Sequence, residues 1–193
     1  MKKNLKAFAS LMVIFSLLLC ATSCSFGDPF KKFSKKIEKE ENFKMTMSMT
    51  IEDVGKITQT SYVDGNIMYY PENTALMTEE YYVESMADSV VEYRKNINNK
   101  WEKTIKENDD AFNLETNDIF NVKNYKRDSE DKNIYTQKKD VIFDNFEDVV
   151  ITFYDESVVI EGNMTMEMVK YEVKIVISEI GEQQLTLPSV SQS

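Results

Sequence analysis

Apolar and polar residues alternate without a break from Phe43 to Ile51, and this pattern constrains the fold more than any other feature of the chain. Every second side chain of FKMTMSMTI is apolar, and methionine occupies three of those positions. A period of two is typical of a β-strand with one buried face and one face in water. The same period returns from Val169 to Ser178, in VKYEVKIVIS. The sequence therefore predicts a sheet with one apolar face.

Turn residues divide much of the remaining chain into further strands. Asp53-Val54-Gly55 ends the first strand, and Asp64-Gly65 is a strong hairpin signal. Consecutive strands joined by short turns form an antiparallel meander, and a change of apolar parity after Met164 requires a turn or bulge, which we place at 165–168. We expect strands at 43–51, 56–63, 66–70, 77–84, 89–95, 100–106, 149–154, 157–164 and 169–178, a hairpin at 125–137, and short helices at 109–120 and 140–146.

A short amphipathic helix is expected before the sheet. Asp28-Pro29 is typical of an N-cap followed by proline at the first helical position. The helix should cover 29–41, and its four early lysines either face anionic lipid headgroups or pair with the glutamates of the helix. These elements predict one α+β domain over 29–181, followed by a polar, frayed tail at 182–193. The apolar residues at helical spacing are Phe30, Phe33 and Ile37.

The first 24 residues have the features of a secretion signal. Three lysines precede an apolar run of 15 residues, which is shorter than the roughly 20 that a spanning helix needs. Small residues come immediately before Cys24, and this pattern resembles the lipobox of bacterial lipoproteins, in which the cysteine is lipidated and begins the mature chain. The resemblance implies a signal peptide at 1–23, a lipidated Cys24 with a tether over 24–28, and attachment to the extracytoplasmic face of the cell membrane. An ordinary secretory signal or an uncleaved anchor is the alternative.

Charge and the missing residue types argue against several classes of function. The chain has no histidine, and its 33 acidic residues outnumber its 23 basic residues. Cleavage before Cys24 removes three lysines and no acid, so the net charge changes from −10 to −13. Nucleic acid is not an expected partner, because contacts to phosphate dominate that binding and an acidic protein would repel the phosphates. Acylation of Cys24 leaves no thiol for catalysis, a disulfide or a metal, and we expect neither catalysis nor a cofactor.

A lipobox, a helix and then a meander follow one another along the chain, and the meander begins with FKMTMSMTIEDVGK and ends with YEVKIVISEIGEQQLTLP. This order resembles the small lipoproteins of low-GC Gram-positive bacteria. It is more distantly similar to the lipoprotein-carrier superfamily and to the actinobacterial lipid-carrier lipoproteins. The resemblance implies a half-barrel, in which the N-terminal helix covers the apolar concave face of a curved antiparallel sheet, in several members around a lipid. It implies no catalytic residue.

Methionines and acidic residues form the clusters with the most chemistry. Met45, Met47 and Met49 share one strand face, and a second group of methionines lies at 164–168. These thioethers fill a core, line an adaptable apolar site or bind copper(I), and core filling is the simplest interpretation. The acidic runs contain oxygen ligands for calcium, but without the glycine-centred spacing of an EF-hand loop they are better read as solvated loops. They lie at 109–110, 128–131 and 144–148.

We predict from the sequence that the protein binds an apolar ligand without catalysis, and a lipid is the ligand that we expect. The ligand would lie between the helix and the methionine-bearing face. Affinity would then come from apolar area removed from water. The alternative is an interaction or sensor protein with a filled core, whose acidic surface binds a protein or a cell-wall component. The residues assigned to the site are Phe30, Phe33 and Ile37 as the lid, and Met45, Met47, Met49, Ile160, Val173 and Ile175 as the floor.

Overall fold

The computed structural model describes residues 28–51, 55–71, 79–86, 89–107, 121–141, 143, 146–166 and 169–190. Within these residues the chain forms one antiparallel sheet of eleven strands, one α-helix and a short 3-10 helix. The elements are α2 (Pro29–Glu40), β1 (Asn42–Ile51), β2 (Gly55–Asp64), β3 (Ile67–Tyr70), β4 (Tyr81–Ser85), β5 (Ser89–Lys95), β6 (Trp101–Glu107), η2 (Val122–Asn124), β7 (Tyr125–Arg127), β8 (Ile134–Gln137), β9 (Phe146–Phe153), β10 (Val158–Met166) and β11 (Val169–Ser178).

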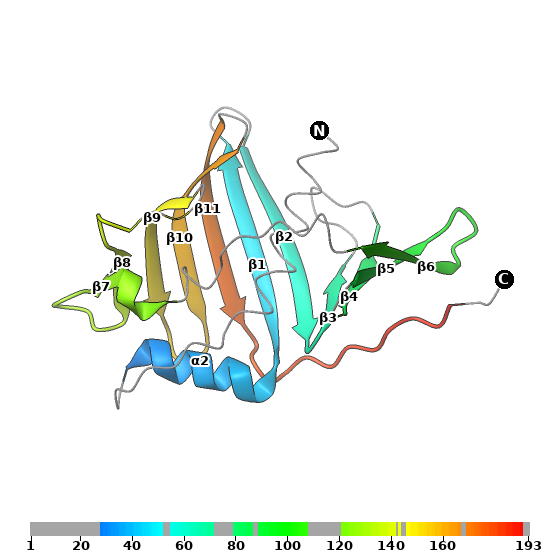
Figure 1. Cartoon of the computed structure of the whole chain (residues 1–193), viewed down its shortest axis with the longest axis horizontal. Coiled ribbons are helices and arrows are strands. Elements are labelled where there is room, and N and C mark those ends of the chain that lie inside the picture. Colours follow the sequence, from blue (N-terminus) through cyan, green and yellow to red (C-terminus); the bar gives the residue numbers. More distant parts are fainter. Residues whose placement is uncertain are drawn as a thin grey trace.

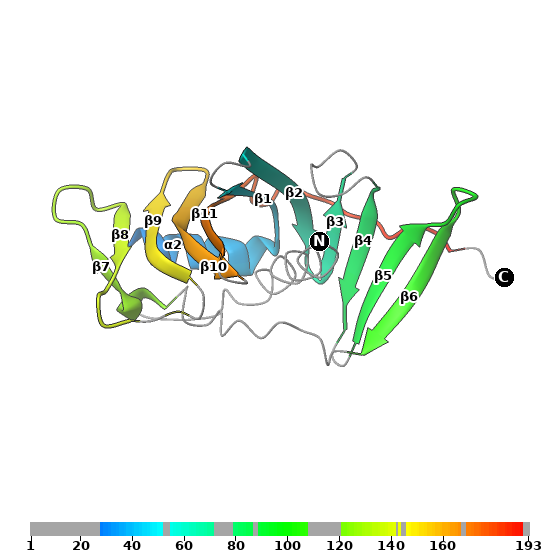
Figure 2. The same ribbon diagram turned by 90° about the horizontal axis from the view of Figure 1, so that it is seen from above.

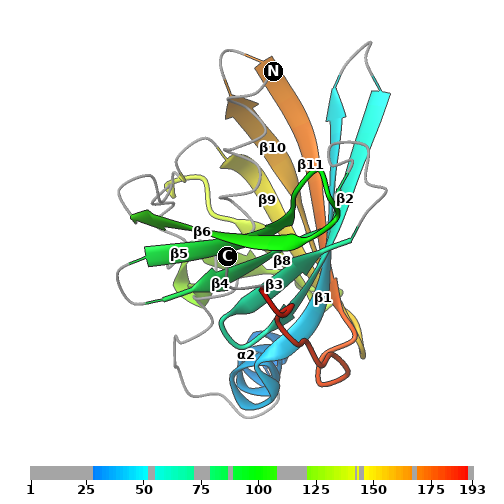
Figure 3. The ribbon, with the colours of Figure 1, turned by 90° about the vertical axis from the view of Figure 1, so that its right-hand side faces the viewer.

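The sheet consists of two meanders joined at its centre. Its strand order is β6-β5-β4-β3-β2-β1-β11-β10-β9-β8-β7, so the first and the last strand are neighbours. Figure 1 shows β1 and β11 side by side, with α2 across one end of β9, β10, β11 and β1. The sheet is curved and open, and β6 and β7 are its two edges (Figure 2). Figure 3 shows β4, β5 and β6 running at a steep angle to β10 and β11, as expected when strand twist accumulates over many strands.

Strand register separates the side chains into two faces. Residues that lie opposite each other in paired strands share a face, and alternation sends their neighbours to the other face. Met45 is opposite Ile177 and Met47 is opposite Ile175, whereas Lys44 is opposite Tyr62 on the other side of the sheet. We call the side that carries Met45, Met47 and Met49 the Met face. The opposite side, which carries Tyr62, Tyr69 and Tyr82, is the tyrosine face.

Helix α2 begins and ends at residues suited to those positions. The Asp28 side chain accepts a hydrogen bond of 2.9 Å from the Phe30 amide, and Pro29 occupies the first helical position, as predicted. At the other end Glu41 has a left-handed conformation with φ of 53°, and its amide donates to the Ile37 carbonyl. The helix is thus one residue shorter than predicted.

Most predicted strands are confirmed, but the helix predicted at 140–146 is wrong. Phe143 forms an isolated bridge with Phe146, and Phe146 already begins β9, three residues before the predicted strand. Both rings are buried. Their spacing of three imitates a helical period, although in the structure two extended residues bury the rings. The hairpin predicted at 125–137 is present as β7 and β8.

The C-terminal tail is also more ordered than predicted. The Gln183 amide donates to the Asn42 side chain over 3.0 Å, and the Leu185 amide donates to the Asp64 side chain over 2.9 Å. These bonds hold the tail along the ends of β1 and β2, so the prediction that it is frayed is wrong there. Composition alone does not reveal such bonds, because the partners are distant in the sequence.

Several other predictions fall outside the described residues. They include the signal at 1–23, Cys24, the helix at 109–120, and the acids at 109–110 and 144–145. Of the turn expected at 165–168, Thr165 and Met166 instead belong to β10, where Met166 lies opposite Val169, and 167–168 lie outside the described residues.

Candidate ligand-binding face

The centre of the Met face is apolar and fully buried. Met45 and Met47 have no exposed surface, and Met49 is buried as well. Met49 lies opposite Val173, while Met47 lies opposite Ile175. Unbranched thioethers side by side with branched aliphatic groups form a surface that repacks easily around different shapes.

The apolar surface continues without a break onto the strands beyond β11. Ile175 is opposite Ile160 on β10, and Ile160 is opposite Ile151 on β9. The structure therefore brings the predicted floor residues together on one face of β1, β11 and β10, and three of them, Met47, Ile175 and Ile160, form a row. All nine residues assigned to lid and floor belong to one cluster of buried side chains, namely Phe30, Phe33, Ile37, Met45, Met47, Met49, Ile160, Val173 and Ile175.

The aromatic contacts of the predicted lid run to β7, β8 and β9. The Phe30 ring centroid is 5.2 Å from that of Phe153 and 5.5 Å from that of Tyr135, and the Phe33 ring is 5.8 Å from Phe153. Tilted and edge-on pairs at these distances are favourable beyond their buried area. The sequence analysis did not assign Phe153 or Tyr135 to the site. Their alternation with polar neighbours in the strands was the available signal.

Two polar side chains interrupt the Met face next to the methionines. Gln59 is opposite Met47 and Ser61 is opposite Met45, and both β2 residues are 0% exposed. The Gln59 side-chain amide donates to the Thr60 carbonyl over 3.1 Å, but the Ser61 hydroxyl oxygen has no hydrogen-bond partner within the structure. A buried polar group without a partner costs about 1–3 kcal/mol. The sequence analysis missed both residues, although they occupy the inward parity of their strand.

The Met face changes from apolar to charged on the far wing of the sheet. Tyr70 and Tyr81 stack with ring centroids 4.3 Å apart, and the Arg94 guanidinium lies 4.0 Å from the Tyr81 centroid. Glu92 accepts from Arg94 over 3.1 Å and from Lys106 over 2.6 Å. Burial alone would raise the pKa of Glu92, but these two hydrogen bonds outweigh it and hold the pKa below its usual value. The face thus has an apolar half and an ionic margin.

On the tyrosine face the aromatic rings pack against one another. The Tyr69 ring stacks between Tyr62, at 6.1 Å, and Tyr82, at 4.6 Å, and Tyr82 meets Trp101 edge-on at 5.5 Å. The Tyr69 hydroxyl donates to Glu80 over 2.9 Å. A stacked row of this kind stiffens the wing of the sheet, and its inner ring faces are not free to form a platform for sugars.

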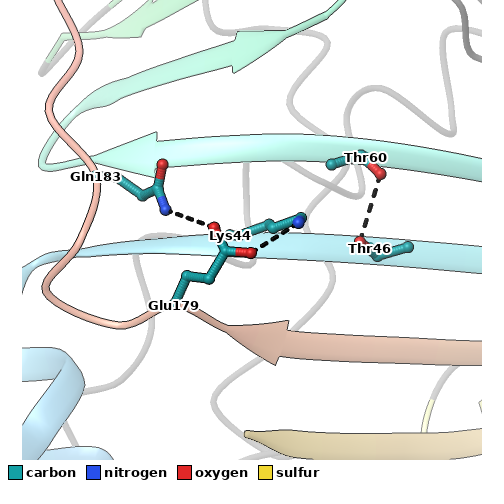
Figure 4. A network of polar contacts seen from close by, with 5 residues as sticks. All are labelled: Lys44, Thr46, Thr60, Glu179 and Gln183. Atoms are coloured by element: carbon teal, nitrogen blue, oxygen red, sulfur yellow. Dashed lines mark hydrogen bonds and ion pairs between the residues drawn. The ribbon is translucent and has the colours of Figure 1, made fainter. Parts of the chain in front are cut away.

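A polar network on the same face ties the last strand to the first (Figure 4). The Lys44 ammonium donates to Glu179 over 2.7 Å, and the Gln183 side chain donates to the other Glu179 oxygen over 3.0 Å. The hydrogen bond from Lys44 lowers the pKa of Glu179. Beside it the hydroxyls of Thr46 and Thr60 are 3.4 Å apart. The network supports the β1–β11 junction from the side opposite the methionines.

The acidic residues near β7 serve as local caps. Asp128 accepts from the amides of Glu130 and Asp131, and these backbone hydrogen bonds lower its pKa. Among the described residues, no group of three or more acids, histidines or cysteines is arranged to hold a metal ion. No helix in the described part of the chain is long and apolar enough to cross a membrane.

No family model matches the chain, and no curated protein matches it. The features that bear on function are the two faces of the sheet and the helix.

Proposed function

We propose that this protein is a lipid-anchored binding protein on the extracytoplasmic face of the cell membrane, which holds an apolar ligand, a lipid, without catalysis. In this proposal the curved sheet is a half-barrel, α2 covers its concave Met face, and Cys24 carries the anchor. A ligand enters between the helix and the methionines.

The observation that carries the proposal is the unbroken apolar row from β1 to β9. Met47, Ile175 and Ile160 are directly opposite one another on successive strands. The row ends on β9 at Ile151, and two aromatic residues of α2 pack on Phe153, two positions along the same strand. An acyl chain placed along it would be removed from water at about 25 cal/mol per Å² of apolar surface.

The polar pair on β2 supports a ligand with one polar end. The Ser61 hydroxyl has no hydrogen-bond partner among the described residues, and Ser61 lies opposite Met45 on the neighbouring strand. A hydroxyl, ester or amide of the ligand placed there would satisfy that group, while the alkyl part contacts the methionines. A fatty acyl ester fits this description better than a pure hydrocarbon.

Native mass spectrometry of the chain from Ser25, expressed in bacteria, tests the proposal. We expect an adduct whose mass corresponds to a lipid and which dissociates on collisional activation. A chain that has only its own mass, and takes up no added fatty acyl ester, would contradict lipid binding.

A matched pair of variants tests the face. Met47→Asp places a charge on the apolar row, whereas Thr46→Asp places the same charge on the tyrosine face of the same strand. We expect loss of the adduct in Met47→Asp and its retention in Thr46→Asp. Circular dichroism spectra of both must match the unmodified chain, and binding in a folded Met47→Asp variant would clear the Met face of this role.

The burial of the floor favours the second candidate, an interaction or sensor protein with a filled core. Met45, Met47 and Ile160 have no exposed surface at all. Such a protein would bind through its acidic exterior. A lipid-free mass after exposure to lipid is the result that selects this candidate over the first.

A further inference from the structure

Strand β6 is a long edge that faces outward over its whole length. It has seven residues, it pairs with β5 on one side, and no described strand pairs with its other side. All side chains from 102 to 106 are exposed, and Ile105 has 65% of its surface in water. The opposite edge, β7, has three residues. An edge this long and unpaired is a template for another strand.

The hairpin between β5 and β6 determines which backbone groups point outward. The Asn96 amide donates to the Lys100 carbonyl, and the Asn99 amide donates to the Asn96 carbonyl, which is the geometry of a three-residue loop. Hydrogen-bonded and non-bonded pairs alternate from there along an antiparallel ladder. Even-numbered residues of β6 therefore bond to β5, and the amides and carbonyls of Trp101, Lys103, Ile105 and Glu107 point away from the sheet.

The sequence of this edge is complementary to itself. When two copies of β6 run antiparallel about a two-fold axis at Thr104, every outward residue meets an outward residue of the second copy. Glu102 then lies opposite Lys106 of the second copy, and Lys106 opposite its Glu102. Lys103 lies opposite Ile105, whose exposed surface the lysine alkyl chain covers. Opposite charges directly across an antiparallel pair are favourable.

Other registers that keep the outward groups paired are poorer. A shift toward the hairpin places Lys103 opposite its own copy, which is repulsive, and shortens the overlap to five strand residues. A shift the other way also reduces the overlap to five. In the two-fold register each β6 strand is covered by the β6 strand of the other copy. The contact is therefore closed, and neither β6 is left to pair with a third copy.

We infer that β6 pairs antiparallel with β6 of a second copy of this chain, and that the two sheets become one continuous sheet across a two-fold axis at Thr104. Main-chain hydrogen bonds supply the contact and the crossed Glu102–Lys106 pairs set its register. This interface goes beyond the proposed ligand site and does not depend on it.

Cysteine cross-linking of the full chain in detergent tests the register, with Cys20→Ser and Cys24→Ser as the background. Thr104→Cys places two thiols at a non-bonded antiparallel pair, where Cα atoms about 4.5 Å apart suit a disulfide. We expect a disulfide-linked species of twice the chain mass under mild oxidation. Lys100→Cys is the matched control, because Lys100 is exposed, takes no part in the proposed pairing and lies about 26 Å from its copy along the strand direction.

Ile105→Pro tests the pairing without a cross-link. Proline removes an outward amide and leaves the bonds between β5 and β6 intact, as edge strands permit. We expect the variant to sediment as a monomer at concentrations where the unmodified chain is a dimer, with an unchanged circular dichroism spectrum. Equal cross-linking of Thr104→Cys and Lys100→Cys, a folded Ile105→Pro dimer, or open polymers formed through β6 and β7 would each overturn the inference.

Discussion

At the scale of single residues, Glu92 is the charge on which the ionic margin of the Met face depends. It accepts from Arg94 on its own strand and from Lys106 on β6, and its side chain is largely shielded from water. Two cations therefore share one carboxylate, and the carboxylate is stabilised in its ionised form.

The lowered pKa of Glu92 predicts an acid-sensitive contribution to stability. Because the folded pKa lies below its ordinary value of 4.5, the contribution is complete above about pH 4.5 and is lost as the pH falls through the folded pKa. We expect Glu92→Gln to lower the free energy of unfolding at pH 7 by about 1–2 kcal/mol and to flatten its decline below pH 4.5. Urea unfolding from pH 2 to 7 measures both. Glu161→Gln is the control, because its pair with Lys174 is half exposed.

The sequence predicted well which side chains of β1 share a buried face. Met45, Met47 and Met49 were assigned to one buried face from their alternation, and the structure buries all three. Gln59 and Ser61 share that face but were missed, because their polarity argues for solvent when each is considered alone. The register to Met47 and Met45, which places them inside, is a long-range property.

At the scale of elements, α2 is joined to the sheet through its own N-cap. One Asp28 oxygen accepts both from the Phe30 amide over 2.9 Å and from the Tyr135 hydroxyl over 2.8 Å. The residue that starts the helix therefore also holds it beside β8.

Asp28→Ala is expected to weaken both the helix and its docking. Loss of an N-cap costs about 1 kcal/mol, and the Tyr135 hydroxyl loses a charged acceptor as well, so we expect a total of about 2 kcal/mol in the free energy of unfolding. Urea denaturation measures it. Asp28→Asn keeps an oxygen at the cap and should recover more than half of the loss, and equal stability of the two variants would contradict the double role.

The irregularity between β9 and β10 requires a residue without a side chain. The register shifts between Glu161 and Asn163, and a Cβ on Gly162 would lie 2.8 Å from the Phe146 ring and 2.9 Å from the Glu147 carbonyl oxygen. We expect Gly162→Ala to destabilise the chain by about 1–3 kcal/mol through overpacking, measured by thermal unfolding. Thr165→Ala, on an exposed position of the same strand, should change stability little.

Elements were predicted where a period of two and turn residues agree. The runs around Asp64-Gly65 meet both conditions and are confirmed. The hairpin expected at 125–137, in a less regular stretch, is confirmed as well. The helix expected at 140–146 lies in a less regular stretch of sequence, and there the pairing of Phe146 with Met164 of β10 prevails.

At the scale of the whole molecule, the proposed anchor decides where the sheet is held. Cys24→Ala is expected to move the protein from the membrane fraction to the soluble fraction, since at least two acyl chains are needed for stable anchoring and the variant has none. Fractionation followed by immunoblotting measures it. Ser25→Ala is the control, and a Cys24→Ala protein that stays with the membrane would contradict the anchor.

The pairing of the strands was harder to predict from the sequence than the strands themselves. Local patterns predicted one meander of consecutive strands, and nothing in them states that β1 pairs with β11, which divides the sheet into two meanders. That pairing joins residues such as Lys44 and Ser178, which are far apart along the chain. The resemblance to lipid-carrier proteins supplied the expectation of a curved sheet, and the structure has one that is open at β6 and β7.

The central position of the first and last strands has a consequence for the order of folding. Synthesis delivers β1 first, yet one of its two neighbours is the last strand to emerge. Until then β1 lacks its second neighbour, and its methionines lack the β11 side chains that lie opposite them. Contacts this distant in sequence make folding slow, and the centre of the sheet forms only after β11 has been synthesised. A chain truncated before Val169 would form two separate half-sheets with exposed apolar faces, not a shortened version of the same protein.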